Sequence, residues 1–313
     1  MMSEYESGVG SVRDLADRLG EVGEEQAFGD VLDHVRCKRG LDCSQYKKSF
    51  LRRRLAVRIR ARSVSTCQEY LAVLRSDPAE LETLITTLTI NLSYFFRDKA
   101  AIERLKDTVL VPLIAQRTKD QQQSLTVWSA GCAAGEEPYS IAMILADLLQ
   151  TSLAEWRLVI HATDVDATTL ARACQGVYRT VNLSPGGGSV PIHLQQAHYV
   201  ARYFIHDGDT FTIRPEIRRL ITFRQHDITT PPPWPRYDLV LCRNVLIYFA
   251  HERQEEIVRH LIEHLEPGGY LMLGMAEMLP PALVSQLDAV DGRLRIYRKP
   301  VKKVTLKNAR EKS

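Results

Sequence analysis

One short stretch constrains the fold of this chain more than any other. From Leu125 to Ser140 the sequence reads LTVWSAGCAAGEEPYS, which is a β-type run, a loop of small residues and the start of a helix. In an α/β sheet, such a turn places a ligand over the carboxyl end of the strand and against the first amides of the helix. The loop brings two acids, Glu136 and Glu137, where a phosphate-binding loop would offer amides or a lysine. We therefore expect a ligand that carries positive charge and no phosphate.

Strand and helix patterns alternate from this point to residue 298. The expected strands are 125–129, 157–163, 220–226, 237–242 and 269–274. The expected helices are 136–150, 166–175 and 251–265, and a final hairpin over 286–298 turns at Asp291-Gly292. Alternation of this kind predicts an α/β fold with a doubly wound, mostly parallel, Rossmann-like sheet over residues 125–298.

The segments before this domain read differently. Residues 27–91 have apolar positions at helical spacing and no convincing strand, so a small all-helical N-terminal domain is predicted there. Helix starts are expected at Ser65 or Thr66 and at Asp77-Pro78. Residues 92–124 are expected to be a connecting segment and helix, with Pro112 as a kink or restart.

Three further segments complete the expected organisation. The interval 177–214 breaks the alternation and is predicted to be an inserted β-subdomain, with an antiparallel hairpin turning at Asp207-Gly208 and a flexible loop at 185–189. Residues 1–26 are expected to be an acidic, flexible N-terminus, and residues 299–313 a basic tail.

Polar residues follow the expected strands at their carboxyl ends. Asp164 ends the second strand, where a carboxylate can accept hydrogen bonds from both ribose hydroxyls. Asp227 is placed to accept from an adenine amino group, with Ile228 against the ring, and Asn244 follows the fourth strand. An adenosine with amino-acid charges and no phosphates describes S-adenosylmethionine. Each acid also has a structural reading, because Asp164 can cap the next helix, for which Asp166 is better placed, and Asp227 can simply end a strand.

Five motifs resemble the chemotaxis receptor methyltransferases of the CheR family, in the family's order. They are 91–98 (NLSYFFRD), 128–140, 162–166 (ATDVD), 242–249 (CRNVLIYF) and 265–269 (LEPGG). The resemblance implies methyl transfer from S-adenosylmethionine, with S-adenosylhomocysteine as product. The acceptors it implies are glutamate side chains of chemoreceptors, which become methyl esters for sensory adaptation in chemotaxis or a related chemosensory pathway.

The resemblance also implies a set of site residues. Those implied to bind the cofactor are Asn91, Ser93, Arg97, Ala130, Gly131, Glu136, Asp164, Asp227, Ile228, Asn244 and Val245. Arg97 and Tyr248 are expected to position the reacting groups, and no metal is expected. Two positions depart from the family pattern: Ser93 replaces the usual threonine and keeps the hydroxyl, while Asp227 stands where asparagine is common and loses a donor.

One expected helix carries an unusual run of charge. The segment Lys47–Arg62 holds eight lysines and arginines and no acid. Arg54, Arg58 and Arg62 repeat every four residues and share one face beside an apolar stripe. A solvated face usually mixes signs, so an acidic partner is expected, which fits the glutamate-rich methylation helices of receptors. A nucleic acid is the alternative, but few aromatic residues interleave with the arginines, so no nucleic acid is expected.

Composition excludes several other classes of protein. Six cysteines are scattered without a C-x-x-C pair, which argues against a zinc site or a disulfide framework and favours a reducing compartment. No apolar run approaches the length of about 18 residues that a membrane span needs. A cytoplasmic protein without membrane insertion is therefore expected, and a monomer.

Two questions stay open at the level of sequence. The inserted hairpin turn at 206–209 looks short, so binding of a receptor C-terminal tether peptide is not expected. The alternatives to receptor methylation are a non-catalytic adaptor that binds S-adenosylmethionine in a chemosensory array, and a methyltransferase that acts on another protein.

Overall fold

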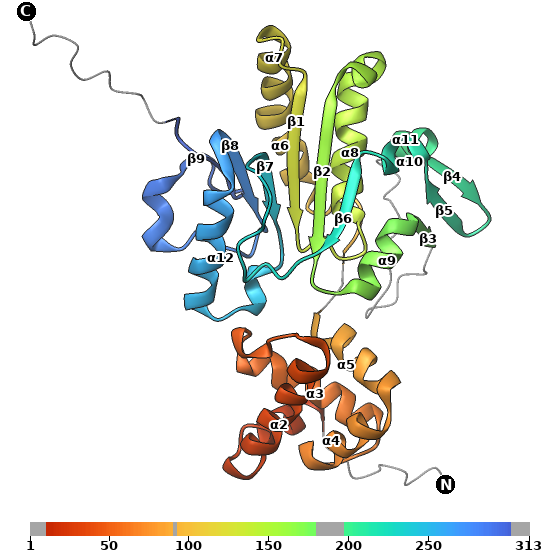
Figure 1. The fold of residues 1–313 in the computed structure, drawn as a ribbon, viewed down its shortest axis with the longest axis vertical. Helices are drawn as coiled ribbons and strands as arrows, with labels where there is room; N and C mark the ends of the chain where they lie inside the picture. The colour runs from red at the N-terminus through yellow and green to blue at the C-terminus, as the bar shows by residue number, and fades with distance from the viewer. Residues whose placement is uncertain (1–10, 90–92, 180–196, 302–313) are drawn as a thin grey trace, which may run out of the picture. The chain divides into compact units, whose positions relative to one another are not determined.

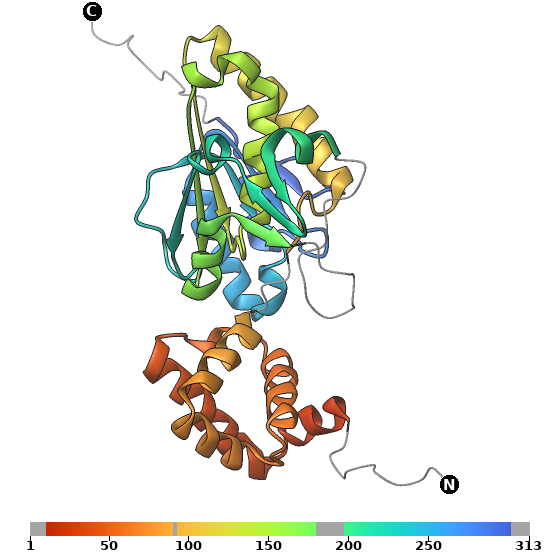
Figure 2. The same cartoon turned by 90° about the vertical axis from the view of Figure 1, so that its right-hand side faces the viewer.

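The computed structural model describes residues 11–89, 93–179 and 197–301. Within them the chain forms two compact units (Figures 1 and 2). The first contains residues 11–89 together with Val165–Thr168 and Tyr248–Arg253, and the second contains the other described residues. Each unit has its own hydrophobic core. No helix of the described residues is long and apolar enough to cross a membrane.

The first unit is built from helices, as predicted for residues 27–91. They are α1 (Val12–Arg18), α2 (Val22–Arg39), α3 (Lys48–Ala61), α4 (Cys67–Ser76) and α5 (Pro78–Thr89), with a 3-10 turn η1 (Cys43–Gln45). The predicted helix starts are confirmed. The Thr66 hydroxyl accepts a hydrogen bond from the amide of Glu69 at 3.2 Å, and the Asp77 carboxylate accepts one from the amide of Ala79 at 3.0 Å. These side chains satisfy amides that a helix N-terminus leaves unpaired.

The segment before residue 27 is helical where irregular structure was expected. Ser11 and Asp14 form a capping box at the start of α1, in which each side chain accepts a hydrogen bond from the backbone amide of the other. Leu15 and Leu19 are buried in the core of the helical unit, and α2 already begins at Val22. The prediction of a flexible N-terminus over 1–26 is therefore wrong from residue 11 onward, because two apolar side chains one turn apart dock the short helix.

The second unit contains a seven-stranded sheet in the order β6-β2-β1-β7-β8-β10-β9. Its strands are β1 (Ser124–Ala130), β2 (Arg157–Asp164), β6 (Ile221–Gln225), β7 (Tyr237–Cys242), β8 (Leu265–Leu273), β9 (Asp288–Asp291) and β10 (Ile296–Arg298). The first five pair in parallel, and β9 and β10 form the predicted antiparallel hairpin. The predicted doubly wound α/β fold is confirmed. β8 begins earlier than expected, at Leu265, because that residue already pairs with Tyr237.

Helices connect these strands along the chain and pack on the sheet. They are α6 (Lys99–Leu105), α7 (Val111–Lys119), α8 (Glu136–Leu149), α9 (Ala167–Gln175), α11 (Pro215–Arg218) and α12 (His251–Glu263). Shorter turns are η2 (Lys106–Leu110), η3 (Gln150–Glu155), η5 (Leu246–Tyr248) and η6 (Pro281–Gln286). The turn η2 is π-helical and lies directly before Pro112, which confirms the predicted interruption, since proline has no N–H for the helical ladder.

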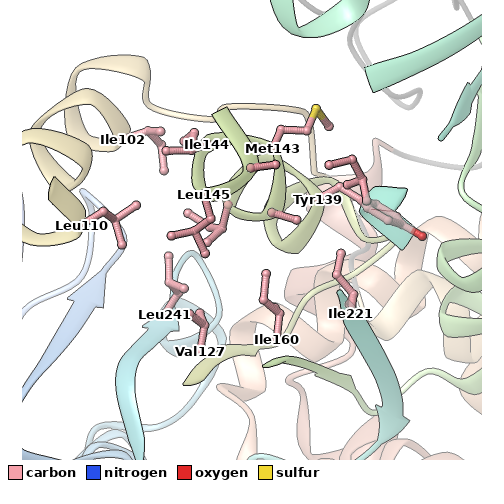
Figure 3. Packing of buried hydrophobic residues seen from close by; sticks show 14 of the residues in the cluster. Ile102, Leu110, Val127, Tyr139, Met143, Ile144, Leu145, Ile160, Ile221 and Leu241 are labelled. Carbon is pink, nitrogen blue, oxygen red and sulfur yellow. The ribbon is translucent and has the colours of Figure 1, made fainter. Parts of the chain in front are cut away.

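The core of the second unit is centred on α8. Figure 3 shows Leu145 of this helix above Val127 and Leu241 of the strands, while Ile144 faces Ile102 of α6. The helix is therefore buried by the sheet on one side and by α6 and η2 on another, which explains why almost every residue of α8 is buried. A helix held on two sides fixes the position of its own N-terminus, where the loop 130–135 ends.

The described residues of the interval 177–214 form a separate small antiparallel sheet, which includes the predicted hairpin. Its strands are β3 (Val177–Arg179), β4 (Phe204–Asp207) and β5 (Thr210–Ile213), paired antiparallel in the order β3-β5-β4. Helix α10 (Ala197–Tyr203) leads into β4, and Gly208, with φ 56°, makes the tight turn between β4 and β5. The strand β3 was not foreseen. The loop predicted at 185–189 lies outside the described residues, as does the tail after residue 301.

A buried ion pair joins α3 to α5 in the helical unit. Arg58 donates from Nε and Nη2 to the two carboxylate oxygens of Glu80 at 2.9 and 2.6 Å, and the Tyr70 hydroxyl donates to Glu80 at 2.5 Å. Burial by itself would raise the pKa of Glu80, but the hydrogen bonds from Arg58 and Tyr70 lower it below the ordinary value. Arg62 adds a contact of 3.1 Å to Asp77. The Arg58 guanidinium is thus held by Glu80 within the helical unit, and its role in docking stays a prediction.

Replacing Arg58 by alanine should lower the free energy of unfolding by about 3 kcal/mol, because buried Glu80 would keep only the Tyr70 hydroxyl and a contact of 3.7 Å to Arg62. The loss should shrink as the pH falls below the ordinary glutamate pKa, since a lowered pKa gives stability that is present above that value and is lost on protonation. Urea unfolding measures both effects. The same substitution at exposed Arg53, on the same helix, is the control, and equal stabilities of the two variants would contradict the assignment.

Candidate functional site

The candidate site is built at the carboxyl edge of the sheet, where β1, β7 and β8 lie side by side and β2 flanks β1. The chain leaves β1 toward β2 on one side and later returns to β7 on the other. This reversal of strand order is the position at which doubly wound sheets bind ligands, because the loops on either side diverge and leave a crevice. The predicted residues after four strands therefore come from adjacent strand ends.

The loop after β1 turns tightly at Gly131. Its φ of 77° lies in the left-handed region, and its amide donates to the carbonyl of Thr163 at 2.8 Å. A Cβ at this position would lie 2.4 Å from Cγ2 of Val245. Glycine is required here because the loop after β1 and the loop after β7 approach each other more closely than any side chain would allow. Two predicted residues, Gly131 and Val245, are thereby brought into contact.

The two acids of this loop have separate roles. Glu137 accepts hydrogen bonds from the hydroxyl of Ser129 at 2.7 Å and from Arg243 at 3.2 Å. Glu136 is the first residue of α8 and its side chain is almost completely buried. Glu137 is thus fixed within the fold, while Glu136 is the acid that stands at the helix N-terminus beside the loop.

Asp164 and Asp166 divide the two roles that the sequence left open. Asp166 accepts a hydrogen bond from the amide of Thr168 at 2.9 Å and so caps α9. Asp164 instead accepts from the amide of Ala133 at 2.9 Å. Its carboxylate therefore faces the loop after β1 rather than the next helix. Ala133 itself has φ 48°, a conformation that costs energy outside glycine and that often marks a functional loop.

Asp227 lies in a turn after β6. One carboxylate oxygen accepts from the amide and the hydroxyl of Thr229 at 2.9 and 2.8 Å, while Oδ2 makes no hydrogen bond to the described residues. Ile228 is buried. One carboxylate oxygen of Asp227 thus stabilises its own turn, and the other can accept a hydrogen bond from a ligand.

Asn244 stands out in the loop after β7. Its φ is 61°, and Asn is one of the few side chains that tolerates this conformation. Its side-chain Oδ1 is buried and has no hydrogen-bond partner among the described residues. A buried acceptor without a donor costs about 1–3 kcal/mol. This atom is therefore the clearest sign that the site is completed by a ligand with hydrogen-bond donors.

The segment 93–98 enters the site before α6. The Arg97 guanidinium lies over the ring of Tyr94, 5.5 Å from its centroid, and the Arg97 carbonyl accepts from Arg243 at 2.8 Å. Asp98 pairs with Arg243 at 2.9 Å rather than with Arg97. Phe96 and Asp98 both have positive φ. Arg243 thus ties this segment to the sheet, and Ser93 at its start is half-buried.

Three of the predicted residues are not among those described at this edge of the sheet. Asn91 lies outside the described residues. Tyr248 groups with the helical unit, where its ring lies 4.9 Å from that of Phe50 and its carbonyl accepts from the amide of Lys47. Arg54 also contacts Phe50, with its guanidinium 5.7 Å from the ring centroid. The roles of Tyr248 and Arg54 stay predictions.

Two buried cysteines flank the loops, Cys132 after β1 and Cys242 at the end of β7. Burial, with nearby carboxylates, raises the pKa of both thiols well above the ordinary value. Neither is therefore a thiolate nucleophile at neutral pH. No cluster of histidine, cysteine and carboxylate side chains that could hold a metal ion occurs in the described part of the chain.

Sequence reasoning missed three residues of this edge. Arg243 and Ser129 hold Glu137, and Glu277 accepts hydrogen bonds from the amides of Asn244 and Val245. Glu277 follows the fifth parallel strand, so inspection of that strand end, as for the other four, would have found it. Arg243 sits inside one of the recognised motifs, but a single sequence does not reveal that its side chain points inward.

Two family models match the chain. The one described as the CheR methyltransferase SAM binding domain matches residues 91–295, and the one described as the CheR methyltransferase all-alpha domain matches residues 26–89. These ranges fall on the sheet-containing and the helical parts of the fold respectively.

Individual relatives agree with these models. A chemotaxis protein methyltransferase of Listeria monocytogenes is 35% identical over 77% of this chain and 85% of its own length, and that of Escherichia coli is 32% identical over 77% and 80%. An uncharacterized 104.1 kDa protein of Rhodobacter capsulatus is 35% identical over 81% of this chain, which spans only 26% of that longer protein. The chain therefore belongs to the CheR family of S-adenosylmethionine-dependent methyltransferases.

Proposed function

We propose that this protein transfers the methyl group of S-adenosylmethionine to glutamate side chains of chemoreceptors, and so forms the methyl esters used for sensory adaptation. The observation that carries the proposal is the match of both family domains in one chain. Relatives named chemotaxis protein methyltransferases, matched over most of their length, support the choice of receptors as substrate.

The residues at the sheet edge fit this cofactor. The unpartnered Oδ1 of Asn244 would accept from a donor such as an amino group. Asp164 would accept from ribose hydroxyls, and Asp227 from the adenine amino group, with Ile228 against the ring. Glu136 would balance the ammonium of the methionine part. Ser93, Ala130, Gly131 and Val245 would line the same space, and Asn91 belongs to the same proposal.

The proposed reaction needs little acid–base chemistry. A glutamate side chain with a pKa of about 4.3 is already ionised at neutral pH, so no general base is required. When bound, the cofactor would supply an electrophilic methyl group on a sulfonium. The chain would have to hold the acceptor carboxylate in line at roughly 3–3.5 Å and exclude water, because two opposite charges are lost on transfer.

Arg97 is the residue we assign to positioning a carboxylate, either that of the acceptor or that of the cofactor. Its guanidinium is oriented by the Tyr94 ring, and its backbone by Arg243. A guanidinium suits this task because it can donate two parallel hydrogen bonds to one carboxylate. Tyr248 stays a proposed hydroxyl partner.

The receptor-docking face requires revision within this proposal. Arg58 is bound to Glu80, and Arg62 contacts Asp77. Arg53 and Arg60 are exposed and pair with no carboxylate among the described residues, and Val57, at 38% exposure, lies between them on the same face of α3. We therefore assign docking of glutamate-rich receptor helices to Arg53, Val57 and Arg60, with Arg54 at the border.

The finer predictions about partners remain part of this proposal. We expect action on the receptor without capture of a C-terminal tether peptide, a monomeric protein, a cytoplasmic location and no nucleic acid partner. The short turn between β4 and β5, made by Gly208, supports independence from the tether.

Incubation with receptor-containing membranes and labelled S-adenosylmethionine should give a labelled receptor that releases methanol in mild base, since carboxyl esters are base-labile. Arg97→Ala should reduce the rate by at least about tenfold while the protein stays folded, which corresponds to about 1.4 kcal/mol of lost stabilisation. A base-stable product would exclude glutamate esters. Cofactor binding without any transfer would favour the adaptor alternative.

Glu136→Gln should weaken binding of S-adenosylmethionine about tenfold, because the side chain keeps its shape but loses its charge. Glu137→Gln is the matched control: it should lower thermal stability, since Glu137 pairs with Arg243, and change the affinity less. Isothermal titration calorimetry and thermal melts separate the two. An unchanged affinity for Glu136→Gln would remove this residue from the cofactor site.

The double variant Arg53→Glu and Arg60→Glu should raise the KM for receptor several-fold and leave the affinity for S-adenosylmethionine unchanged, because charge complementarity would be reversed only at the docking face. The effect should diminish at high salt. Reversal of two exposed arginines in the other unit, Arg236 and Arg293, changes the net charge equally and should not alter KM. Equal effects of the two pairs would show that only total charge matters.

A further inference from the structure

The buried carboxylate of Glu277, which follows β8, accepts hydrogen bonds from the backbone amides of the loop after β7. Glu277 is 3% exposed. One of its oxygens accepts from the amides of Val245 and Leu246 at 2.8 and 2.7 Å, and the other accepts from the amides of Asn244 and Gly274 at 3.0 and 2.6 Å. Four backbone donors thus converge on one side chain.

This arrangement requires the ionised form of Glu277. A carboxylate offers about four acceptor directions and no donor, and all four are used here. Protonation would turn one oxygen into a donor that faces two N–H groups. No lysine, arginine or histidine pairs with Glu277 within the described ranges, so amide dipoles alone compensate its charge. Burial raises the pKa of Glu277 although the four amides oppose that rise, which means that keeping the charge buried costs stability.

The free-energy cost of burying the Glu277 charge points to a role beyond satisfying backbone amides. A neutral acceptor or a water could satisfy amides at the surface without burying a charge. The amides held by Glu277 belong to Asn244 and Val245, the residues with the buried free acceptor and with the contact at Gly131. Glu277 therefore joins the loops after β7 and β8 directly, and Val245 carries the contact on to the loop after β1.

Gly274 belongs to the same group of hydrogen bonds. A Cβ at this position would lie 2.7 Å from the backbone nitrogen of Asn244 and 2.7 Å from Oε2 of Glu277. The space that a side chain would fill is occupied by the hydrogen bond between the two loops. Substitution at Gly274 therefore offers a second way to disturb the loop, with Glu277 itself intact.

We infer that Glu277 is a positioning residue for cofactor binding: its carboxylate fixes the backbone of residues 244–246, and thereby aims the Asn244 side chain at the ligand and sets Val245 against Gly131. Glu277 acts through these residues and has no assigned contact with the cofactor. The inference rests on the cofactor site of the family and not on the choice of receptor as substrate.

The test is the affinity of the full chain for S-adenosylhomocysteine, measured by calorimetry without any receptor. Glu277→Gln keeps the size of the side chain but replaces one acceptor oxygen by an NH₂ donor, so two of the four amides lose their partner. The dissociation constant should rise at least tenfold. Hydrogen exchange at the amides of 244–246 should become faster in the unliganded protein. Because no receptor is present, failure of this result would leave the proposed substrate untouched.

Glu80→Gln is the matched control, because Glu80 is an equally buried glutamate at 3% exposure in the other unit. It should lower the melting temperature and leave the dissociation constant unchanged, which separates positioning from general stability. Gly274→Ala should weaken binding as Glu277→Gln does, and it decides the question if the glutamine variant does not fold. Affinity within twofold of the wild type for a folded Glu277→Gln variant, or for Gly274→Ala in its place, would overturn the inference.

Discussion

The candidate site depends on one buried guanidinium. Arg243 reaches from the end of β7 to Glu137 on one side and to Asp98 and the Arg97 carbonyl on the other. Removing Arg243 would leave the largely buried carboxylate of Glu137 without its cation, which is costly in the interior of a protein. Arg243 pairs with Glu137 and Asp98, while the carboxylates of Glu136, Asp164 and Glu277 are buried nearby at the same edge of the sheet. Of the two loop acids, Glu137 is thus the one that pairs with the arginine.

Much of the fold could be predicted because it is written in local signals. Caps such as Thr66 and Asp77 are short-range interactions that a sequence states directly, and the parallel strands follow from alternation of strand and helix patterns. The start of α1 was missed because a capping box and two leucines are weak signals beside an acidic, polar composition. The start of β8 was missed because Leu265 pairs across an irregularity that only the register with β7 reveals.

The candidate site was predictable residue by residue at strand ends, but not in its internal bonding. Sequence spacing placed Arg54, Arg58 and Arg62 on one helical face; in the structure Arg62 is the C-cap residue of α3. It could not show that Glu80 of α5 and Asp77, directly before α5, would form ion pairs with Arg58 and Arg62. The exposed arginines of α3 without a carboxylate partner among the described residues are instead Arg53 and Arg60, because α3 packs against α1 and α5. Similarly, Glu277 is remote in sequence from the amides of residues 244–246, whose hydrogen bonds it accepts, so no motif around Asn244 points to it.

The state of the two buried cysteines has a chemical consequence for an enzyme that handles an activated methyl group. A thiolate is a far stronger nucleophile toward a sulfonium methyl than a carboxylate is, and Cys132 and Cys242 both belong to the loops and strands of the site. Burial and the adjoining carboxylates keep both as neutral thiols. Burial, assisted by the adjoining carboxylates, therefore also protects the protein from becoming its own methyl acceptor.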